Sequence, residues 1–182
     1  MTLPDPAPAA GPGAPTDAAA TLVAVLTARG LTLAVAESLT GGLVTAEIVR
    51  IPGASAVLAG GVVAYQTPLK HSLLGVDAAL LAEHGPVHPE VARQMARGAR
   101  TLLPVDGRDA DIGVATTGVA GPGSQDGQPA GTVYLGLAHR SGAWAVRLDL
   151  SGDRAQIRAQ TVQHALEAVC QLIESEMPES TE

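Results

Sequence analysis

The sequence has no phenylalanine, one tryptophan, two tyrosines and one cysteine. With so few aromatic side chains there is no row on which successive nucleic-acid bases could stack. The single cysteine, Cys170, excludes an intramolecular disulfide, and no Cys or Cys/His spacing predicts a structural zinc site. We therefore expect a core built from Ala, Val, Leu and Ile.

Basic residues are also scarce, since the formal net charge is -7 and no cluster of Lys or Arg occurs. A protein that binds nucleic acid needs a basic face, so we expect no such partner, although a pocket with a few donors can bind a small anion. No apolar run reaches the roughly 18 to 20 residues that cross a membrane. Residues 1–16 lack the basic start and apolar run of a secretory signal. We expect a cytoplasmic protein without membrane association.

Residues 1–16 are rich in Pro, Ala and Gly and are predicted to form a flexible tail, followed by a single domain over residues 17–177. Start, stop and periodicity signals predict helices over 17–29, 38–53, 67–76, 77–84, 88–103 and 152–176. Apolar segments predict strands over 31–37, 55–65, 110–118, 131–138 and 143–150, the last two forming a hairpin. This order indicates a three-layer α/β/α fold with a mixed, mostly parallel sheet of about five strands.

Lys70 is the only lysine, and every other basic residue apart from histidine is an arginine. Arg and Lys serve almost equally well on a solvated surface, but only Lys can lose its proton inside a protein. Burial lowers the pKa of a lysine side chain toward neutrality. Lys70 therefore marks either a site that has to lose a proton or an accident of composition.

Two predicted strands end in segments that suit a ligand site, because ligands of open α/β sheets bind outside the carboxyl ends of strands. Ser38, in the segment AESLTGG, follows the first strand and is either a nucleophile or the N-cap of the next helix. The second segment, TTGVAGPGSQDGQPAG, has neither a dinucleotide GxGxxG nor the Lys-Ser/Thr of a P-loop. Its glycines allow close approach of a ligand to the backbone, or form a long hairpin connection.

The five histidines show no metal-ligand spacing and no carboxylate pattern that singles out a base. Glu37 precedes Ser38 directly, and on a strand adjacent side chains point to opposite faces, so a structural role is at least as consistent as an orienting one. The candidate bases near Ser38 are therefore Lys70 and, with it, Tyr65.

Several segments together resemble one known family: AESLTGG, GGVVAYQTPLK followed by LLGV, GPVHPEVARQMARGAR, TTGVAGPG, GTVYLGLA and GDRAQIRAQTVQHAL. The resemblance is to the CinA C-terminal domain family, the nicotinamide-nucleotide amidohydrolases, and extends in order over residues 17–175. One departure is Leu39, where the family often has Cys.

The resemblance implies an α/β/α protein that hydrolyses the carboxamide of nicotinamide mononucleotide to nicotinate mononucleotide and ammonia. It also implies Ser38 as the nucleophile and Tyr65 and Lys70 as its activators. With no suitable histidine, the base is expected to be a neutral Lys70, while Tyr65 relays a proton to the departing ammonia. No metal or organic cofactor is needed for such a hydrolysis.

The expected substrate-binding residues bring backbone N–H groups or positive charge to a phosphate or an oxyanion. They are Thr40, Gly41, Gly42, Thr117, Gly118, Gly121, Gly123 and Arg154. Arg154, at the start of the last predicted helix, is the expected cationic partner of the phosphate, with a solvated surface position as the alternative.

Some relatives carry an additional N-terminal domain that resembles molybdopterin-binding proteins. Because no segment of that size occurs in this sequence, the chain is expected to be the stand-alone form. It is also expected to form a homo-oligomer. The alternative to an amidohydrolase is a non-catalytic nucleotide-binding or regulatory protein that keeps the same pocket. Such a binding module has no need of a lone lysine beside a serine.

Overall fold

The computed structural model describes residues 17–176, and the predicted tail over residues 1–16 lies outside them. Five strands form one mixed sheet in the order β2-β1-β3-β4-β5. Their bounds are β1 Leu33–Glu37, β2 Leu58–Val63, β3 Ile112–Gly118, β4 Thr132–His139 and β5 Gly142–Asp149. β1 pairs in parallel with β2 and β3, whereas β3–β4 and β4–β5 are antiparallel. The predicted sheet and its terminal hairpin are confirmed.

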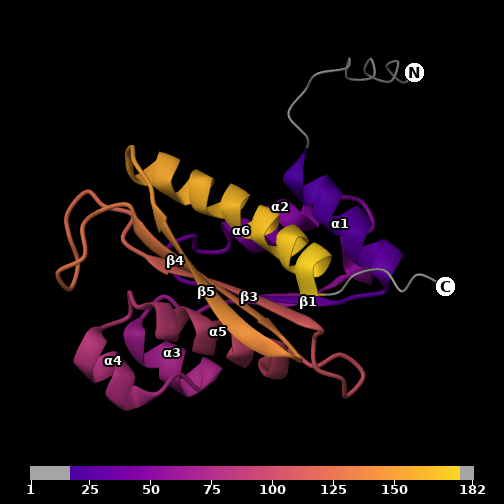
Figure 1. Ribbon diagram of the computed structural model, residues 1–182, viewed down its shortest axis with the longest axis horizontal. Coiled ribbons are helices and arrows are strands. Elements are labelled where there is room, and N and C mark those ends of the chain that lie inside the picture. The colour runs from indigo at the N-terminus through magenta and orange to yellow at the C-terminus, as the bar shows by residue number, and fades with distance from the viewer. Residues whose placement is uncertain (1–16, 177–182) are drawn as a thin grey trace, which may run out of the picture.

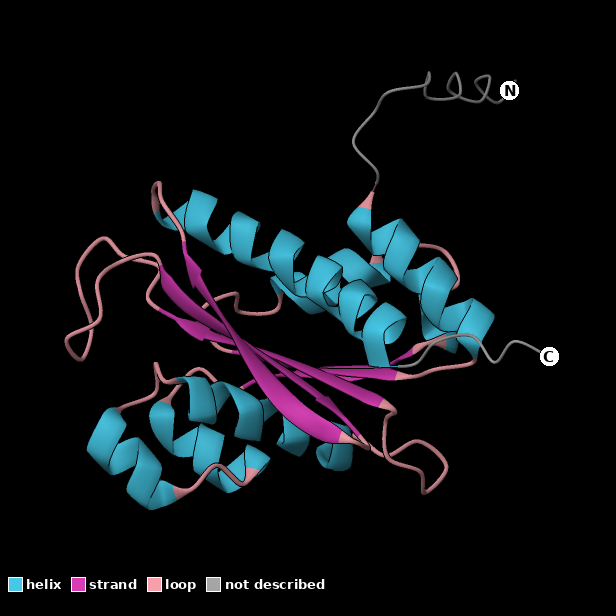
Figure 2. Cartoon of the chain, in the orientation of Figure 1, coloured by secondary structure: helices cyan, strands magenta, loops and turns pink. Residues whose placement is uncertain are grey.

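Helices cover both faces of the sheet (Figure 1). One layer contains α1 (Ala18–Arg29), α2 (Leu43–Val49) and the long α6 (Arg154–Glu176). The opposite layer contains α3 (Thr67–Leu74), α4 (Ala78–His84) and α5 (Pro89–Leu102), as Figure 2 shows in the same view. A short 3-10 helix, Ala54–Ala56, leads into β2. The three-layer α/β/α architecture is therefore as predicted.

The two faces of the sheet are packed by side chains of different size. Toward α1 and α6 the core is made of large aliphatic side chains, among them Leu22, Leu33, Ile112, Leu135 and Leu166. Toward α5 it is rich in alanine, and the backbone of α5 comes so close to the sheet that a Cβ at Gly136 would collide with the Ala92 carbonyl. The small residues of β3 and β4 thus let α5 lie directly on the strands.

The predicted helix over residues 38–53 is wrong at its start and end. α2 begins only at Leu43 and ends at Val49, and residues 38–42 form a turn in which Gly41 and Gly42 have φ of 61° and 99°. Such left-handed backbone suits glycine because a Cβ is disfavoured there. The predicted helix over residues 67–76 is confirmed as α3, with Gln66 in extended backbone as its N-cap, and it ends at Leu74.

Residues that follow β1, β2 and β3 meet at one edge of the sheet, because parallel strands bring their carboxyl ends together. Ser38 follows β1, Tyr65 follows β2, and the loop 119–131 joins β3 to β4. No helix within residues 17–176 is long and apolar enough to cross a membrane.

Candidate active site

Ser38 lies at the end of β1 and is held by the neighbouring strand. Its N–H donates to the Thr116 carbonyl over 3.0 Å, which continues the β1–β3 pairing by one residue. Its side chain lines a cavity of about 420 Å³ although the residue is only 9% exposed. The chain then turns sharply at Gly41 and Gly42 instead of continuing the strand, so that the serine stands at a strand-to-helix turn.

Lys70 comes from α3 and is 1% exposed. Its Nζ lies 3.0 Å from Ser38 Oγ, 2.8 Å from the Ala64 carbonyl oxygen and 3.3 Å from the Tyr65 carbonyl oxygen. Burial lowers the pKa of Lys70 from 10.5 to about 8. A lysine in this setting is ready to lose its proton near neutral pH.

The three partners of Lys70 also suit a neutral amine. An uncharged NH₂ group has two N–H donors and one lone pair. The carbonyls of Ala64 and Tyr65 can accept both N–H groups, which leaves the lone pair facing Ser38 Oγ. The geometry therefore permits Ser38 to donate its hydroxyl proton to Lys70.

Glu37 is fully buried and holds the start of α2. Its carboxylate accepts from the N–H groups of Gly42, Val44 and Thr45 over 2.9 to 3.1 Å, and from the Thr45 hydroxyl over 2.7 Å. A carboxylate at this position satisfies the unpaired N–H groups and the positive end of the helix dipole. The role of Glu37 is thus structural, and it fixes the turn that presents Ser38.

This carboxylate corrects the expectation that Thr40, Gly41 and Gly42 bind the substrate. The Gly42 N–H is taken by Glu37, and the Gly41 N–H donates to the Ser38 carbonyl. Thr40 is fully buried, and its hydroxyl bonds that of Thr116 at 2.8 Å. None of the three lines the cavity. An internal carboxylate has occupied the helix N-terminus where an anion was expected.

The cavity lies between the Ser38 turn, the start of α3 and the loop after β3. Of the expected substrate-binding residues, Thr117, Gly118, Gly121, Gly123 and Arg154 line it. The Thr117 hydroxyl is already engaged, since it donates to the Pro86 carbonyl over 2.7 Å. Residues that were not expected to bind substrate complete the wall, namely Leu39, Gln66, Thr67, Pro86, Val87, Val119, Ala120, Ser124 and Gln125.

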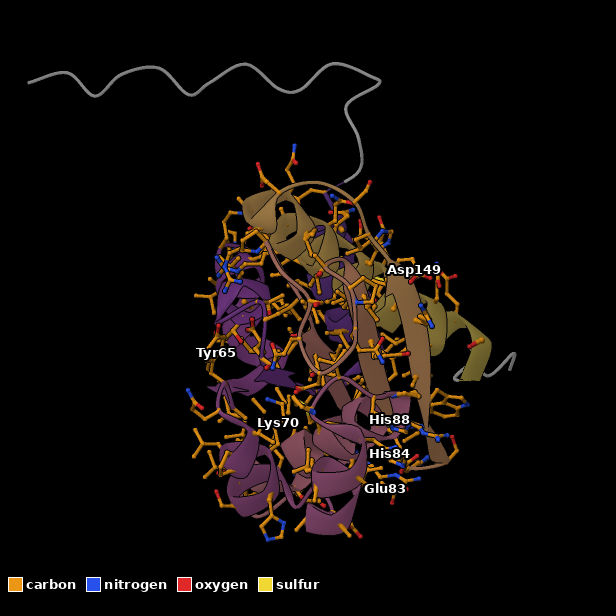
Figure 3. All side chains as sticks on the ribbon, turned by 90° about the vertical axis from the view of Figure 1, so that its left-hand side faces the viewer. Tyr65, Lys70, Glu83, His84, His88 and Asp149 are labelled. Atoms are coloured by element: carbon orange, nitrogen blue, oxygen red, sulfur yellow. The ribbon has the colours of Figure 1, made fainter. Side chains whose placement is uncertain are left out.

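Arg154 and Tyr65 meet at the mouth of this cavity. The Arg154 guanidinium donates to the Gly121 carbonyl over 3.0 Å and to the Tyr65 hydroxyl over 3.3 Å. Tyr65 is 54% exposed and lies at the edge of the molecule in Figure 3, whereas Lys70 lies nearer its centre. The structure brings the carbonyl of Tyr65 to Lys70, while its hydroxyl bonds Arg154.

Sequence reasoning missed Arg158, one turn after Arg154 on α6. Its Nε donates to the Leu39 carbonyl over 3.0 Å and its Nη2 to the Thr40 carbonyl over 2.8 Å. Arginines at positions i and i+4 share a helix face, so Arg154 was the available signal that this face of α6 looks toward the site. Arg158 itself does not line the cavity.

No histidine lines the cavity, which agrees with their predicted structural role. His84 and His88 stack with ring centroids 4.7 Å apart, and His88 accepts from the Glu90 N–H as the N-cap of α5. Figure 3 shows this pair away from Tyr65. Among residues 17–176 no group of three or more His, Cys, Asp or Glu side chains is arranged to hold a metal ion. The titratable side chain that bonds Ser38 Oγ is that of Lys70.

Comparisons with known proteins agree on one family. The model of the CinA C-terminal domain matches residues 15–173. A CinA-like protein of Frankia casuarinae is 45% identical over 152 residues, which cover 84% of this chain and 34% of that protein. A CinA-like protein of Geobacter sulfurreducens is 47% identical over 140 residues, covering 76% and 33%. The chain thus spans about a third of the length of these curated relatives.

Solved structures of similar size have the same fold. The competence/damage inducible protein CihA of Agrobacterium tumefaciens superposes with a TM-score of 0.80 at 35% identity, covering 87% of this chain and 96% of that one. A CinA superfamily protein of Klebsiella pneumoniae gives 0.80 at 36% identity, covering 88% and 99%. Since the family model matches residues 15–173 and a relative is 45% identical over 84% of the chain, the chain belongs to the CinA C-terminal domain family.

Proposed function

We propose that this protein is a serine amidohydrolase that converts nicotinamide mononucleotide and water to nicotinate mononucleotide and ammonia. The observation that carries the proposal is the 3.0 Å contact between Ser38 Oγ and the buried Nζ of Lys70. A serine hydroxyl is a poor nucleophile until a base takes its proton, and here Lys70 is the base within reach. The choice of substrate rests on the family resemblance.

In the first half of the reaction Ser38 Oγ attacks the carboxamide carbon as its proton passes to Lys70 Nζ. The C–O bond forms, the C=O bond becomes C–O⁻, and a tetrahedral intermediate results. Lys70 then returns the proton to the amide nitrogen, the C–N bond breaks, and ammonia leaves an ester on Ser38. One proton therefore moves from the serine to the leaving group through a single lysine.

In the second half water attacks the ester carbon and gives a proton to Lys70. Collapse of the second tetrahedral intermediate breaks the bond to Ser38 Oγ, which regains its proton from Lys70. The product carboxylic acid loses its proton to solvent, and ammonia becomes ammonium. The enzyme ends the cycle as it began, and no electron acceptor or metal takes part.

The cavity supplies positive charge and backbone donors for an anionic substrate. Its volume of about 420 Å³ falls in the range of small-molecule sites. Arg154 stands at its mouth, where an incoming phosphate can replace the Gly121 carbonyl and the Tyr65 hydroxyl as partners of the guanidinium. Before substrate binds, Tyr65 orients Arg154 through its hydroxyl, and its carbonyl accepts from Lys70 throughout.

The test is release of ammonia and nicotinate mononucleotide from nicotinamide mononucleotide by the purified full-length chain, with Ser38→Ala as the matched control. We expect turnover by the wild type, turnover unchanged after exhaustive chelation, and none by a folded Ser38→Ala variant. The substitution removes the nucleophile from a turn whose backbone bonds stay intact. Binding of the nucleotide by the wild type without turnover would instead identify a non-catalytic nucleotide-binding protein.

A further inference from the structure

Arg158 holds the turn that carries Ser38 by two carbonyl oxygens at once. Its bonds of 3.0 and 2.8 Å to the Leu39 and Thr40 carbonyls use two nitrogens of one planar guanidinium. Gly41 follows these two residues with φ of 61°, a left-handed backbone that favours glycine. Two parallel N–H donors fix the direction of both peptide groups, which a single point donor does not.

The orientation of these carbonyls determines where the adjacent N–H groups point. In a trans peptide the N–H is directed opposite to the C=O. Because the Leu39 carbonyl faces Arg158, the Thr40 N–H, which belongs to the same peptide, faces away from it. The next peptide behaves alike, since its carbonyl bonds Arg158 and its Gly41 N–H turns back to the Ser38 carbonyl.

The Leu39 N–H is left without a hydrogen-bond acceptor among residues 17–176. It belongs to the same peptide as the Ser38 carbonyl, so it points away from the Gly41 N–H that this carbonyl accepts. Leu39 is only 4% exposed and lines the cavity, whereas Thr40 is fully buried and does not. Buried N–H groups are almost always paired in folded proteins. One that stays unpaired at the cavity directly after a serine nucleophile matches the position of an oxyanion hole, in which the residue after the nucleophile donates.

We propose that Arg158 is a positioning residue that, through the Thr40 carbonyl and the Gly41 N–H, holds the Leu39 N–H toward the oxyanion formed on attack by Ser38. Glu37 holds the other end of the same turn through the Gly42 N–H, so the turn is clamped on both sides. The inference rests on the proposed serine chemistry but not on which amide is the substrate.

The two arginines of this helix face should differ in kinetic signature. Arg154 lines the cavity and Arg158 does not. A group that acts only on transition-state donors lowers kcat and leaves KM unchanged, whereas a substrate contact at the mouth raises KM. Arg158→Ala is therefore expected to lower kcat about a hundredfold at constant KM, the scale seen when one oxyanion donor is lost. Arg154→Ala serves as the matched comparison, with a higher KM.

A second readout is the rate at which a fluorophosphonate probe labels Ser38, because its P=O oxygen needs the same donors as an amide carbonyl. We expect the labelling rate of Arg158→Ala to fall by a similar factor and to recover in part when methylguanidine is added. Arg158→Lys keeps the charge but not the paired donors, and is expected to stay at least about tenfold below wild type. The exposed Arg50→Ala controls for non-specific effects of methylguanidine.

The proposal is overturned if Arg158→Ala or Arg158→Lys keeps the wild-type kcat and the wild-type labelling rate. It is also overturned if methylguanidine never restores any of the labelling rate that Arg158→Ala loses. If Arg158→Ala does not fold, Arg158→Lys decides alone, with reduced kcat at unchanged KM and unchanged unfolding temperature as the supporting result. Labelling of wild-type Ser38 without deamidation of nicotinamide mononucleotide would reject the proposed substrate and leave the role of Arg158 testable.

Discussion

Lys70 Nζ and Ser38 Oγ lie 3.0 Å apart although 32 positions separate the two residues in the sequence. The contact is buried, and the lysine shares it with the carbonyls of Ala64 and Tyr65. No other lysine occurs in the chain, and unlike the arginines this lysine can lose its proton inside the protein.

Replacement of Lys70 by arginine separates a base from a binding cation. Arg keeps the positive charge but stays protonated, so we expect Lys70→Arg to lower kcat at least about a hundredfold. Nicotinamide mononucleotide should still bind, measured by calorimetry beside the kinetics. Lys70→Met, which fits the buried slot without a charge, is the matched control and should be equally inactive. A Lys70→Arg variant that turns over near the wild-type rate would reject the assignment of the base.

The pH dependence of the reaction follows from the lowered pKa of Lys70. The active form is the neutral amine, and the pKa of Lys70 in the folded protein is about 8. We therefore expect kcat/KM to rise about tenfold for each pH unit below 8 and to level off above it, because the free enzyme loses its proton there. Initial rates from pH 6 to 9.5 measure this. A flat profile between pH 6 and 8 would contradict a lysine base.

The same ionisation predicts how Lys70 affects stability. The pKa is 10.5 in the unfolded chain and about 8 in the folded one, so between these values the unfolded chain binds more protons. The contribution of Lys70 to stability is therefore lowest below pH 8 and rises as the pH approaches 10.5. At 1.36 kcal/mol for each pKa unit, burial of the charged form costs roughly 3 to 3.5 kcal/mol.

Lys70→Met lacks this term at every pH. We expect its free energy of unfolding, relative to wild type, to decrease by about 2 to 3 kcal/mol between pH 7 and 10. Urea titrations at several pH values give the difference, in which the pH-independent effect of the lost hydrogen bonds cancels. A difference that stays constant over this range would show that Lys70 does not change its charge there.

Tyr65→Phe distinguishes a proton relay from a residue of the cavity mouth. The Tyr65 carbonyl that bonds Lys70 remains in the variant, while the hydroxyl partner of Arg154 is lost. From this arrangement we expect KM to rise several-fold and kcat to fall by less than about tenfold. A fall in kcat near the hundredfold scale of a positioned acid, with KM unchanged, would instead assign the relay to Tyr65.

The local pattern of the sequence was sufficient for the order of helices and strands, for the three-layer fold, and for the place of Ser38 at the end of a strand. Apolar periodicity, capping residues and the parallel arrangement of neighbouring strands carry this information within short segments. Lys70 was recognisable as a candidate base because, unlike the arginines, it can be deprotonated, and the family resemblance named it as an activator of Ser38.

Only the tertiary structure decided which backbone donors are available at the site. Glu37 takes the Gly42 N–H, which was expected to bind the substrate, together with the N–H groups of Val44 and Thr45, because the turn at Gly41 and Gly42 brings that helix start over its carboxylate. Arg158 reaches Leu39 across 119 positions of sequence. Such hydrogen bonds depend on how distant segments pack, and side-chain direction at a turn has no periodic signature in the sequence.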